Sequence, residues 1–294
     1  MKAKDILSIY GELFKARQTI LLLYTTIFSY LITVVEVSGD FNWFNFLFLI
    51  LSLFLAISGT TTLNMFIDKD IDAIMERTKN RPLPSGKISP STVLINGIVL
   101  TFLGILIAIF SLGWLTALII FFGFFFDVVI YSIWLKRRTK FSIIFGGIAG
   151  GLPAMAGRVA ILGRLDAVGM DFLLFILAWI PVHILTLALL PKNFNGYKEA
   201  KVPMWPVVSS ENQTMRVIAL GAIASSLVLY RIAHVLNLSA IIRIIIGACD
   251  LLLLVIVVKN LIKPSNKLTF LIFKIASLFM ILGFLILYIG IIFT

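Results

Sequence analysis

Three oxygen-bearing side chains recur at intervals of four residues near position 68. Asn64, Asp68 and Asp72 would share one face over two helical turns, if the helix containing Asn64 continues that far. Asp70 falls about 200° away around the same helix and should point elsewhere. Two carboxylates one turn apart repel each other unless a cation holds them, and Mg²⁺ binds through one or two carboxylates together with substrate phosphates. The spacing predicts that Asn64, Asp68 and Asp72 hold Mg²⁺, one or two ions, on a phosphate-bearing substrate.

Basic side chains follow shortly after these acids. Arg77, Lys79 and Arg81 precede the Pro82–Gly86 turn and supply donors for phosphate oxygens, the arginines in bidentate fashion. This order predicts a diphosphate bound through metal, with Arg77 and Arg81 neutralising the leaving group. The alternative is a solvated loop braced by salt bridges, which is what most charge runs are. Asn64 argues against that alternative, because a polar group inside an otherwise apolar run is costly.

The composition requires lipid as the main solvent of the chain that positions these residues. Of 294 residues, 60% are hydrophobic and 13% are charged, with a mean hydropathy of +1.07. A water-soluble chain could not cover so much apolar side chain with so little charge. The net charge of +11 does not indicate nucleic-acid binding, since the charges fall between apolar runs rather than in one patch. The lone Cys249 excludes an internal disulfide and a cysteine-based metal site.

Nine apolar runs have the length of about 20 residues that a helix needs to cross hydrocarbon. They predict an all-α membrane protein, a bundle of about nine transmembrane helices around a central chamber. No long linker divides the chain, so residues 1–294 should form one domain. The runs cover residues 18–37, 44–63, 93–112, 114–135, 141–162, 170–190, 217–236, 238–258 and 268–293.

The distribution of lysine and arginine predicts the orientation of the bundle. Of the 25 basic residues, 20 lie on alternate connections, and positively charged loops stay inside the cell. The N-terminus should therefore be cytoplasmic and the C-terminus outside. No cleavable signal peptide is visible, so an uncleaved first helix should insert the chain into the cell (plasma) membrane. The basic connections are the N-terminal segment with Lys2, Lys4, Lys15 and Arg17, and the loops 64–92, 136–140, 191–216 and 259–267.

These basic connections supply further candidates for binding a diphosphate at the cytoplasmic surface. Lys136 and Arg137 end the fourth span, where they either determine topology or stabilise the leaving diphosphate. Tyr131, in the same span, has a ring face that can stabilise a nearby positive charge. Asp127, one turn earlier, is an acid within a span and is notable for that reason. The cations that we expect to contact the diphosphate are Arg17, Lys79, Lys136, Arg137, Lys192 and Lys198.

Residues 64–86, which read NMFIDKDIDAIMERTKNRPLPSG, resemble the first Asp-rich motif of the UbiA-type intramembrane prenyltransferases. The later part of this segment is most similar to the branch that farnesylates protohaem IX, the haem O synthases. The resemblance covers roughly residues 15–210. Three further stretches support that branch: YSIWLKRRT with GGIAGGLP (131–139 and 146–153), WIPVH (179–183) and YKEAKVPMWPVV (197–208).

The resemblance implies an activity and its substrates. An enzyme of this branch transfers a farnesyl, or related prenyl, group from a prenyl diphosphate to the vinyl group of haem b, giving haem O. Haem O is a step towards haem A for terminal oxidases, so haem A synthase or oxidase assembly factors are possible partners. His183 and Trp179 are the implied haem contacts, since imidazole is a common ligand of haem iron. A histidine simply hydrogen-bonded inside the bundle is the alternative.

One departure from the family pattern concerns a second acidic motif in the 191–216 loop. Where the family has acids, this chain has Asn195 and Gly196, and only Asn193 and Glu199 are nearby substitutes. Glu199 is therefore the one further candidate metal ligand. Two other functions stay open: the same chemistry on an aromatic quinone precursor or a glycerol-phosphate lipid, and a non-catalytic transporter or lipid-binding protein. The small-residue pairs at 146–151 are expected to serve helix packing.

Overall fold

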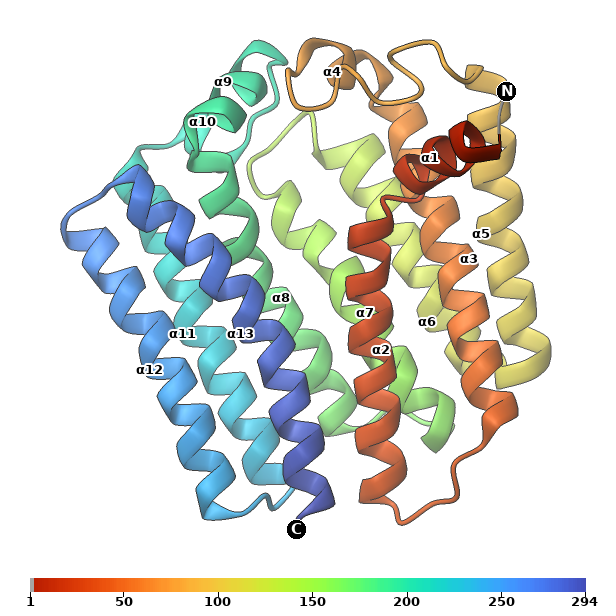
Figure 1. Ribbon diagram of the computed structural model, residues 1–294, viewed down its shortest axis with the longest axis vertical. Helices are drawn as coiled ribbons and strands as arrows, with labels where there is room; N and C mark the ends of the chain where they lie inside the picture. The colour runs from red at the N-terminus through yellow and green to blue at the C-terminus, as the bar shows by residue number, and fades with distance from the viewer. Residues whose placement is uncertain (1–2) are drawn as a thin grey trace.

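The computed structural model describes residues 3–294, with side chains from residue 8 onwards, so Lys2 and the side chain of Lys4 lie outside it. Within this range, nine helices are long and apolar enough to cross a membrane, as predicted. They run side by side along the long axis of the molecule (Figure 1). These helices are α2 (Ala16–Glu36), α3 (Trp43–Ile67), α5 (Pro90–Leu112), α6 (Trp114–Phe124) continued by the π-helix η1 (Phe125–Leu135), α7 (Ser142–Leu162), α8 (Ala167–Leu189), α11 (Glu211–Val235), α12 (Ala240–Ile262) and α13 (Asn266–Ile292).

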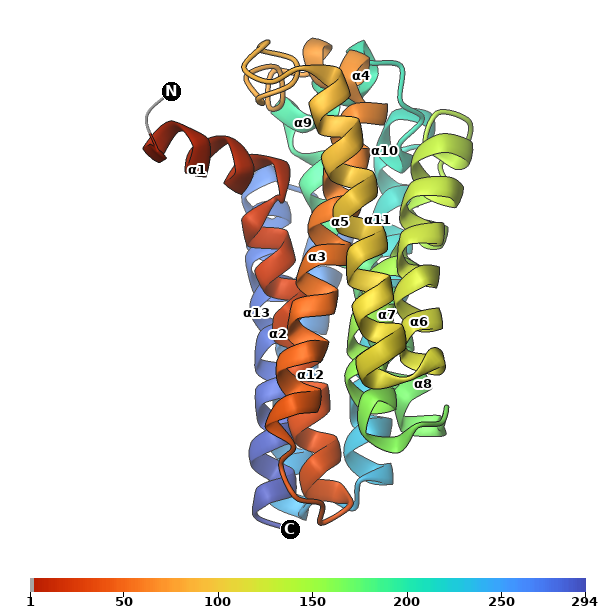
Figure 2. The same ribbon diagram turned by 90° about the vertical axis from the view of Figure 1, so that its right-hand side faces the viewer.

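Four short helices gather at one end of the bundle. They are α1 (Ala3–Leu13), α4 (Lys69–Ile74), α9 (Pro191–Glu199) and α10 (Trp205–Val208). This is the end that carries the N-terminus, while the C-terminus lies at the opposite end (Figure 1). Seen from the side, α1 projects sideways from the bundle (Figure 2). The two longest polar loops therefore share one end, and that this end faces the cytoplasm stays a prediction.

Polar caps decide where several of the spanning helices begin. The hydroxyl of Ser89 accepts a hydrogen bond from the Thr92 amide ahead of Pro90. Ser210 and Gln213 form a capping box, which satisfies two amides that the first turn leaves free. Helix α11 consequently starts at Glu211, several residues before the apolar run from which a helix at 217 was predicted. Hydropathy locates the part of a helix inside the membrane, whereas capping locates its end.

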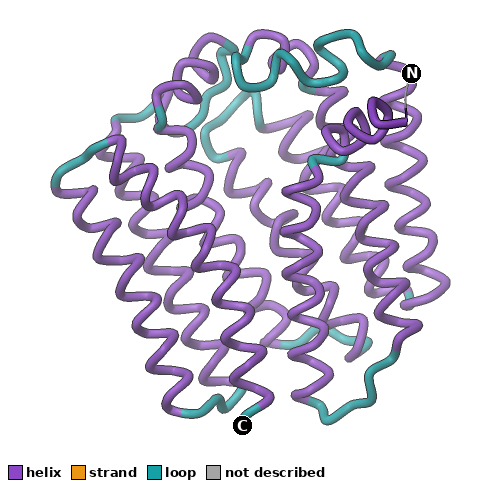
Figure 3. The backbone as a smooth tube through the Cα atoms, viewed as in Figure 1, coloured by secondary structure: helices purple, strands orange, loops and turns teal. Residues whose placement is uncertain are grey.

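Two short connections between spans depend on residues with left-handed or related backbone. Gly113, with φ +90°, separates α5 from α6, and Asn237, with φ +53°, separates α11 from α12. Glycine and asparagine tolerate positive φ better than other residues do. Both breaks lie where the sequence predicted them, and Figure 3 shows the short loops that result between long helices.

The core has two main parts, one on each side of the bundle. The first lies mainly among α2, α3, α5, α6 and α7, and the second mainly among α8, α11, α12 and α13. Small residues let α7 and α8 meet closely between these parts. A Cβ at Gly151 would lie 2.6 Å from the Leu173 carbonyl oxygen, so no larger side chain fits. The predicted packing role of the small residues on α7 is confirmed there.

Candidate functional site

The predicted face of oxygen-bearing side chains forms at the junction of α3 and α4. Helical hydrogen bonds continue through it, from the Asp68 amide to the Asn64 carbonyl (2.9 Å) and from the Asp72 amide to the Asp68 carbonyl (2.7 Å). Asn64, Asp68 and Asp72 are 4%, 5% and 4% exposed, so all three point into the protein. Burying these three polar side chains costs free energy unless each is hydrogen-bonded or paired with a charge.

Asp70 points away from this face, as its position in the helical period predicts. Its side chain is 58% exposed and accepts two hydrogen bonds from the Arg137 guanidinium, at 2.6 and 2.7 Å. That guanidinium lowers the pKa of Asp70 to about 2. Arg137 also donates to the Ile67 carbonyl at 3.0 Å. The predicted diphosphate contact Arg137 is thus engaged at the surface by Asp70 in this structure.

Two residues of η1 hold the side chain of Asn64. The Asn64 amide nitrogen donates to Asp127 Oδ2 at 2.7 Å, and its oxygen accepts from the Ser132 hydroxyl at 2.8 Å. These two contacts, one at each end of the amide, fix the orientation of the Asn64 side chain. The Asn64 oxygen keeps a second lone pair, which can serve a metal ion or a substrate.

The π-helical form of η1 is what brings these partners together. A π-helix bonds residue i to i+5 and so has about 4.4 residues per turn, against 3.6 for an α-helix. Asp127, Ser132 and Lys136 then share one face, whereas an α-helix would place Asp127 and Lys136 on opposite faces. The Lys136 amide indeed donates to the Tyr131 carbonyl, at 2.8 Å. The widened turn therefore aims three polar side chains at α3.

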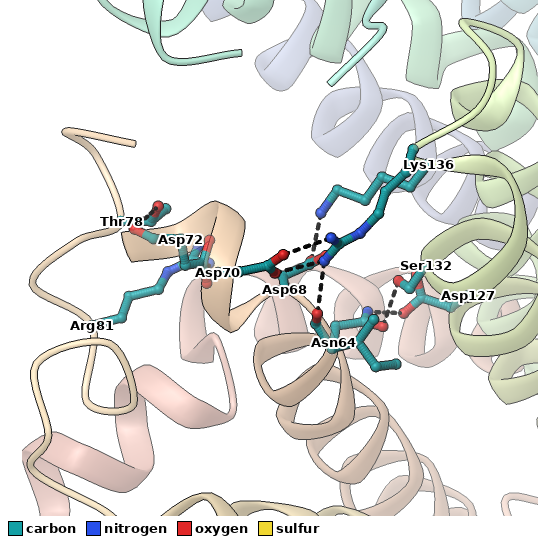
Figure 4. A network of polar contacts seen from close by, with 11 residues as sticks. Asn64, Asp68, Asp70, Asp72, Thr78, Arg81, Asp127, Ser132 and Lys136 are labelled. Carbon is teal, nitrogen blue, oxygen red and sulfur yellow. Dashed lines mark hydrogen bonds and ion pairs between the residues drawn. The ribbon is translucent and has the colours of Figure 1, made fainter. Parts of the chain in front are cut away.

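The carboxylates of Asp68 and Asp72 each meet a basic side chain (Figure 4). Lys136 Nζ lies 2.5 Å from Asp68 Oδ2, and an Arg81 guanidinium nitrogen lies 2.7 Å from Asp72 Oδ2. Asp68 Oδ1 is buried and has no hydrogen-bond partner among the described residues. Burial opposes the charged form of Lys136, yet Tyr131 and Asp68 together raise the pKa of this lysine. The site is thus a set of charge pairs with one unused carboxylate oxygen.

That unused oxygen fits a metal ion, but the protein offers too few ligands to hold one alone. Within the described residues, no three His, Cys, Asp or Glu side chains are grouped so that they could bind a metal. Mg²⁺ commonly binds one or two carboxylates and completes its coordination with phosphate oxygens and water. The donors here, Asp68, Asp72 and Asn64, suit that mode of binding.

Lys15 is a cation of this site that the sequence did not single out. It joins α1 to α2 with φ +44°, an uncommon backbone conformation for a lysine. Burial, and then the positive charge of Arg81, lowers the pKa of Lys15 to about 8. The charges of Asp127, Lys136 and Asp68 also act on the pKa of Lys15. Arg17, a predicted diphosphate contact, is exposed.

Several other predicted cations lie on the surface beside the site. Arg77 is exposed, and Lys79 pairs with Glu76 at 2.6 Å, where both side chains are largely exposed. Lys192 and Lys198 are exposed on α9. The structure therefore brings Arg81 and Lys136 to the acids and leaves these four facing solvent.

Helix α9 is the place where the family pattern predicts a second set of acids. Asn195 is exposed, and so is the candidate ligand Glu199. Gly196 is buried, and a Cβ there would lie 3.3 Å from the Met75 methyl group. The Asn193 amide donates to the Leu187 carbonyl at 2.9 Å, so it caps the end of α8. In this segment the inward-facing positions serve packing.

His183 lies between two aromatic rings. It stacks on Trp179 and on Phe273, with centroids 4.6 and 4.7 Å away. Its Nδ1 lies 3.2 Å from the Ser277 hydroxyl, and the Trp179 indole donates to the Ala276 carbonyl at 2.6 Å. These contacts join α8 to α13 and orient the imidazole, whose Nε2 has no partner among the described residues.

The residues that sequence reasoning missed share a cause. Ser132 and Lys15 are of common types, and neither has a spacing that connects it to the acids. Asp127 stood out only as an acid within a span. Nothing in the hydropathy of 125–135 distinguishes a π-helix from an α-helix, so the contacts of this segment could not be predicted.

Residues 22–281 match the UbiA prenyltransferase family. Over 197 residues the chain is 42% identical to a protoheme IX farnesyltransferase of Archaeoglobus fulgidus, and the matched region covers 67% of each protein. It is 34% identical over 289 residues to a protoheme IX farnesyltransferase of Thermofilum pendens, which covers 97% of this chain and 98% of that one.

Two solved structures are similar along nearly the whole chain. One is a digeranylgeranylglyceryl phosphate synthase, with a TM-score of 0.80, 20% identity and coverage of 98% of this chain and 99% of that one. The other is a UbiA homolog from Archaeoglobus fulgidus bound to GPP and Mg²⁺, with a TM-score of 0.67, 16% identity and coverage of 95% and 99%. At these identities the two structures show a shared fold.

Proposed function

The chain belongs to the UbiA prenyltransferase family, and on that premise we propose that it transfers a farnesyl group from a prenyl diphosphate to the vinyl group of haem b. The observation that supports this most is the buried face of Asn64, Asp68 and Asp72 with its unused carboxylate oxygen. The names of the relatives support haem b as acceptor and farnesyl as the transferred group.

The donor end of the reaction is the α3–α4 junction. Asp68, Asp72 and Asn64 would hold Mg²⁺, which when bound neutralises negative charge on the diphosphate. Arg81, Lys136 and Lys15 would donate hydrogen bonds to phosphate oxygens as the allylic carbon–oxygen bond breaks, so that negative charge develops among fixed cations. Arg77, Lys79, Arg137, Lys192 and Lys198 form an outer set of cations that attracts the diphosphate to this end.

The allylic cation needs protection from water until it reacts. The prenyl chain would lie among the apolar spans, which exclude water. The Tyr131 ring lies 5.6 Å from Lys136 Nζ, so it is close to the leaving group and can stabilise positive charge through its ring face. Bond formation to the vinyl carbon of haem b then leaves a cation next to the macrocycle. Water captures that cation and loses a proton, giving a hydroxyalkyl product.

The acceptor end would be the side of α8. His183 is held between aromatic rings with Nδ1 on Ser277, which leaves Nε2 as the nitrogen able to meet haem. We place the protein in the plasma membrane with the polar end in the cytoplasm, in agreement with the positive charge of the loops there. The acidic cluster at one membrane surface disfavours a transporter, whose polar groups usually lie at the midplane.

The proposal is tested with purified protein, haem b, farnesyl diphosphate and Mg²⁺, with products separated by chromatography and identified by mass. We expect a farnesylated haem from the wild type and none from Asp68→Asn. Parallel reactions replace haem b by an aromatic quinone precursor or by a glycerol-phosphate lipid. If haem b stays unreacted and one of these two acceptors is prenylated, that acceptor is the substrate and the haem assignment is wrong. If no acceptor gives a product, the result contradicts prenyl transfer.

A further inference from the structure

Lys136 pairs with one carboxylate oxygen of Asp68, the residue that we propose as a metal ligand. Lys136 Nζ lies 2.5 Å from Asp68 Oδ2, with the two side chains 13% and 8% exposed. The other carboxylate oxygen, Oδ1, is buried and unpartnered among the described residues. One oxygen of Asp68 is therefore neutralised by an ammonium while the second stays free.

The position of this lysine is set by several elements rather than by a flexible loop. It follows the π-helix η1, and its amide bonds to the Tyr131 carbonyl five residues earlier. The Tyr131 ring lies beneath its ammonium at 5.6 Å. Gly146 of α7 makes room for that ring, since a Cβ there would lie 2.8 Å from it. The fold thus directs Lys136 at Asp68.

An ammonium and a divalent cation compete for the same carboxylate. Two cations within a few ångströms repel strongly at low dielectric, so Mg²⁺ cannot bind Asp68 fully while Lys136 stays in contact with it. A diphosphate changes this balance because it provides new anionic oxygens. The lysine can then exchange the carboxylate for a phosphate oxygen, and Asp68 becomes available to the metal.

We propose that Lys136 is a placeholder for the metal: it keeps Asp68 neutralised and divalent cations weakly bound until a diphosphate arrives. Metal and diphosphate then bind as a coupled pair, each raising the affinity of the other by the same factor. Arg81 on Asp72 is the same arrangement at the second carboxylate. The inference rests on the proposed function, because it assumes that the substrate is a diphosphate.

The test measures binding of Mn²⁺ by electron paramagnetic resonance to the purified full chain, with and without inorganic diphosphate. Lys136→Met removes the placeholder, and Arg138→Met, an exposed cation two residues away, removes the same charge without that contact. We expect Lys136→Met to bind Mn²⁺ alone about 10-fold more tightly than wild type. Diphosphate should raise the Mn²⁺ affinity of the wild type and of Arg138→Met strongly, and that of Lys136→Met much less.

Three outcomes would overturn the inference. Unchanged or weaker Mn²⁺ binding by both Lys136→Met and Lys136→Gln would show that the lysine does not compete with metal. An equal gain of Mn²⁺ affinity in Arg138→Met would show that the effect comes from the change in net charge and not from the contact with Asp68. Wild-type protein that binds Mn²⁺ tightly without diphosphate would exclude a placeholder, although the proposed function would stand. If the wild type binds no Mn²⁺ even with diphosphate, the result contradicts the proposed metal-dependent function itself, and with it this inference.

Discussion

Two loops at the same end of the bundle present opposite chemistry. The segment from Asn64 to Arg81 turns two of its carboxylates, Asp68 and Asp72, inward and pairs each with a cation. The segment from Pro191 to Val208 turns a glycine and a capping asparagine inward and leaves Glu199 and its lysines exposed. The family pattern predicts acids in both. One loop is therefore built to hold charge inside, and the other to close the end of the bundle.

The contrast shows how burial distinguishes charges of similar type. Exposed pairs such as Lys79 with Glu76 contribute little to the stability of the fold, because water screens the charges and the long side chains lose entropy when they pair. The buried pairs on Asp68 and Asp72 are costly to form unless each partner is satisfied. Asp68 Oδ1 has no hydrogen-bond partner in the described part of the chain, so it is free to bind a ligand. The predictions below compare the two loops, from the largest expected effect to the smallest.

The largest effect is expected from the acids of the first loop. Asp68→Asn and Asp72→Asn should each lower kcat/KM for prenyl transfer by about 100-fold or more, since they remove carboxylate ligands of the Mg²⁺ that would neutralise the leaving diphosphate. Asp70→Asn, in the same short helix, is the matched control and should stay within about 3-fold because its pair is exposed. A loss in Asp70→Asn as large as in Asp68→Asn would show that the inward and outward faces are not functionally different.

The next effect concerns the residues that orient Asn64. Asp127→Asn and Ser132→Ala should lower metal affinity or kcat by about 10- to 100-fold, the range found for partners of metal ligands. The loss should diminish at high Mg²⁺ concentration, which a general folding defect would not do. Asp250→Asn, a buried acid on α12, is the control and should leave kcat unchanged. Losses that are insensitive to Mg²⁺ would contradict an orienting role.

A third effect depends on pH through Lys15. Its pKa of about 8 means that the free enzyme loses this cation as the pH rises through 8, so kcat/KM for the diphosphate should fall there. Lys15→Met should lower kcat/KM at neutral pH by about 10-fold and should not show this alkaline decline. Lys15→Arg should restore activity without the decline, because arginine stays charged. Identical pH profiles in all three proteins would remove Lys15 from the site.

The smallest effect is expected in the second loop. Lys192→Ala, Lys198→Ala and Glu199→Gln should each change kcat/KM by less than about 3-fold, since exposed charges interact weakly. The lysine variants should matter more at low salt, where screening is weaker. A Glu199→Gln variant with a large increase in its Mg²⁺ requirement would instead place Glu199 in a metal site and make the two loops equivalent.

The number of spans and their positions along the chain were predictable because the membrane constrains them so strongly. Hydrocarbon thickness sets the length of each apolar run, and all nine runs are helices in the structure. The inward face was predictable too, since Asn64, Asp68 and Asp72 follow the helical period. Helix ends were less so, because they depend on caps such as Ser210 that lie outside the apolar runs.

The partners of the acids were not predictable from spacing along the chain. Lys136 was expected to meet diphosphate, but its contact with Asp68 depends on the π-helix, whose wider turn leaves no trace in hydropathy. Lys15 has a backbone conformation that its residue type does not favour, and the charges of Arg81 and Asp127 act on its pKa. Arg17, two residues later, was the cation predicted to contact diphosphate, and it is exposed. The positions of Lys136 and Lys15 both depend on contacts between segments far apart in the sequence.

The most direct test of the account measures binding of a non-reacting farnesyl thiodiphosphate by calorimetry in the presence of Mg²⁺. It compares the wild type with Asp68→Asn/Asp72→Asn and with Asn195→Ala/Glu199→Gln. We predict that the first double variant loses Mg²⁺-dependent binding and that the second binds within about 3-fold of the wild type. Retained binding in the first variant, or lost binding in the second, would contradict the claim that the inward acids of the α3–α4 junction hold the diphosphate.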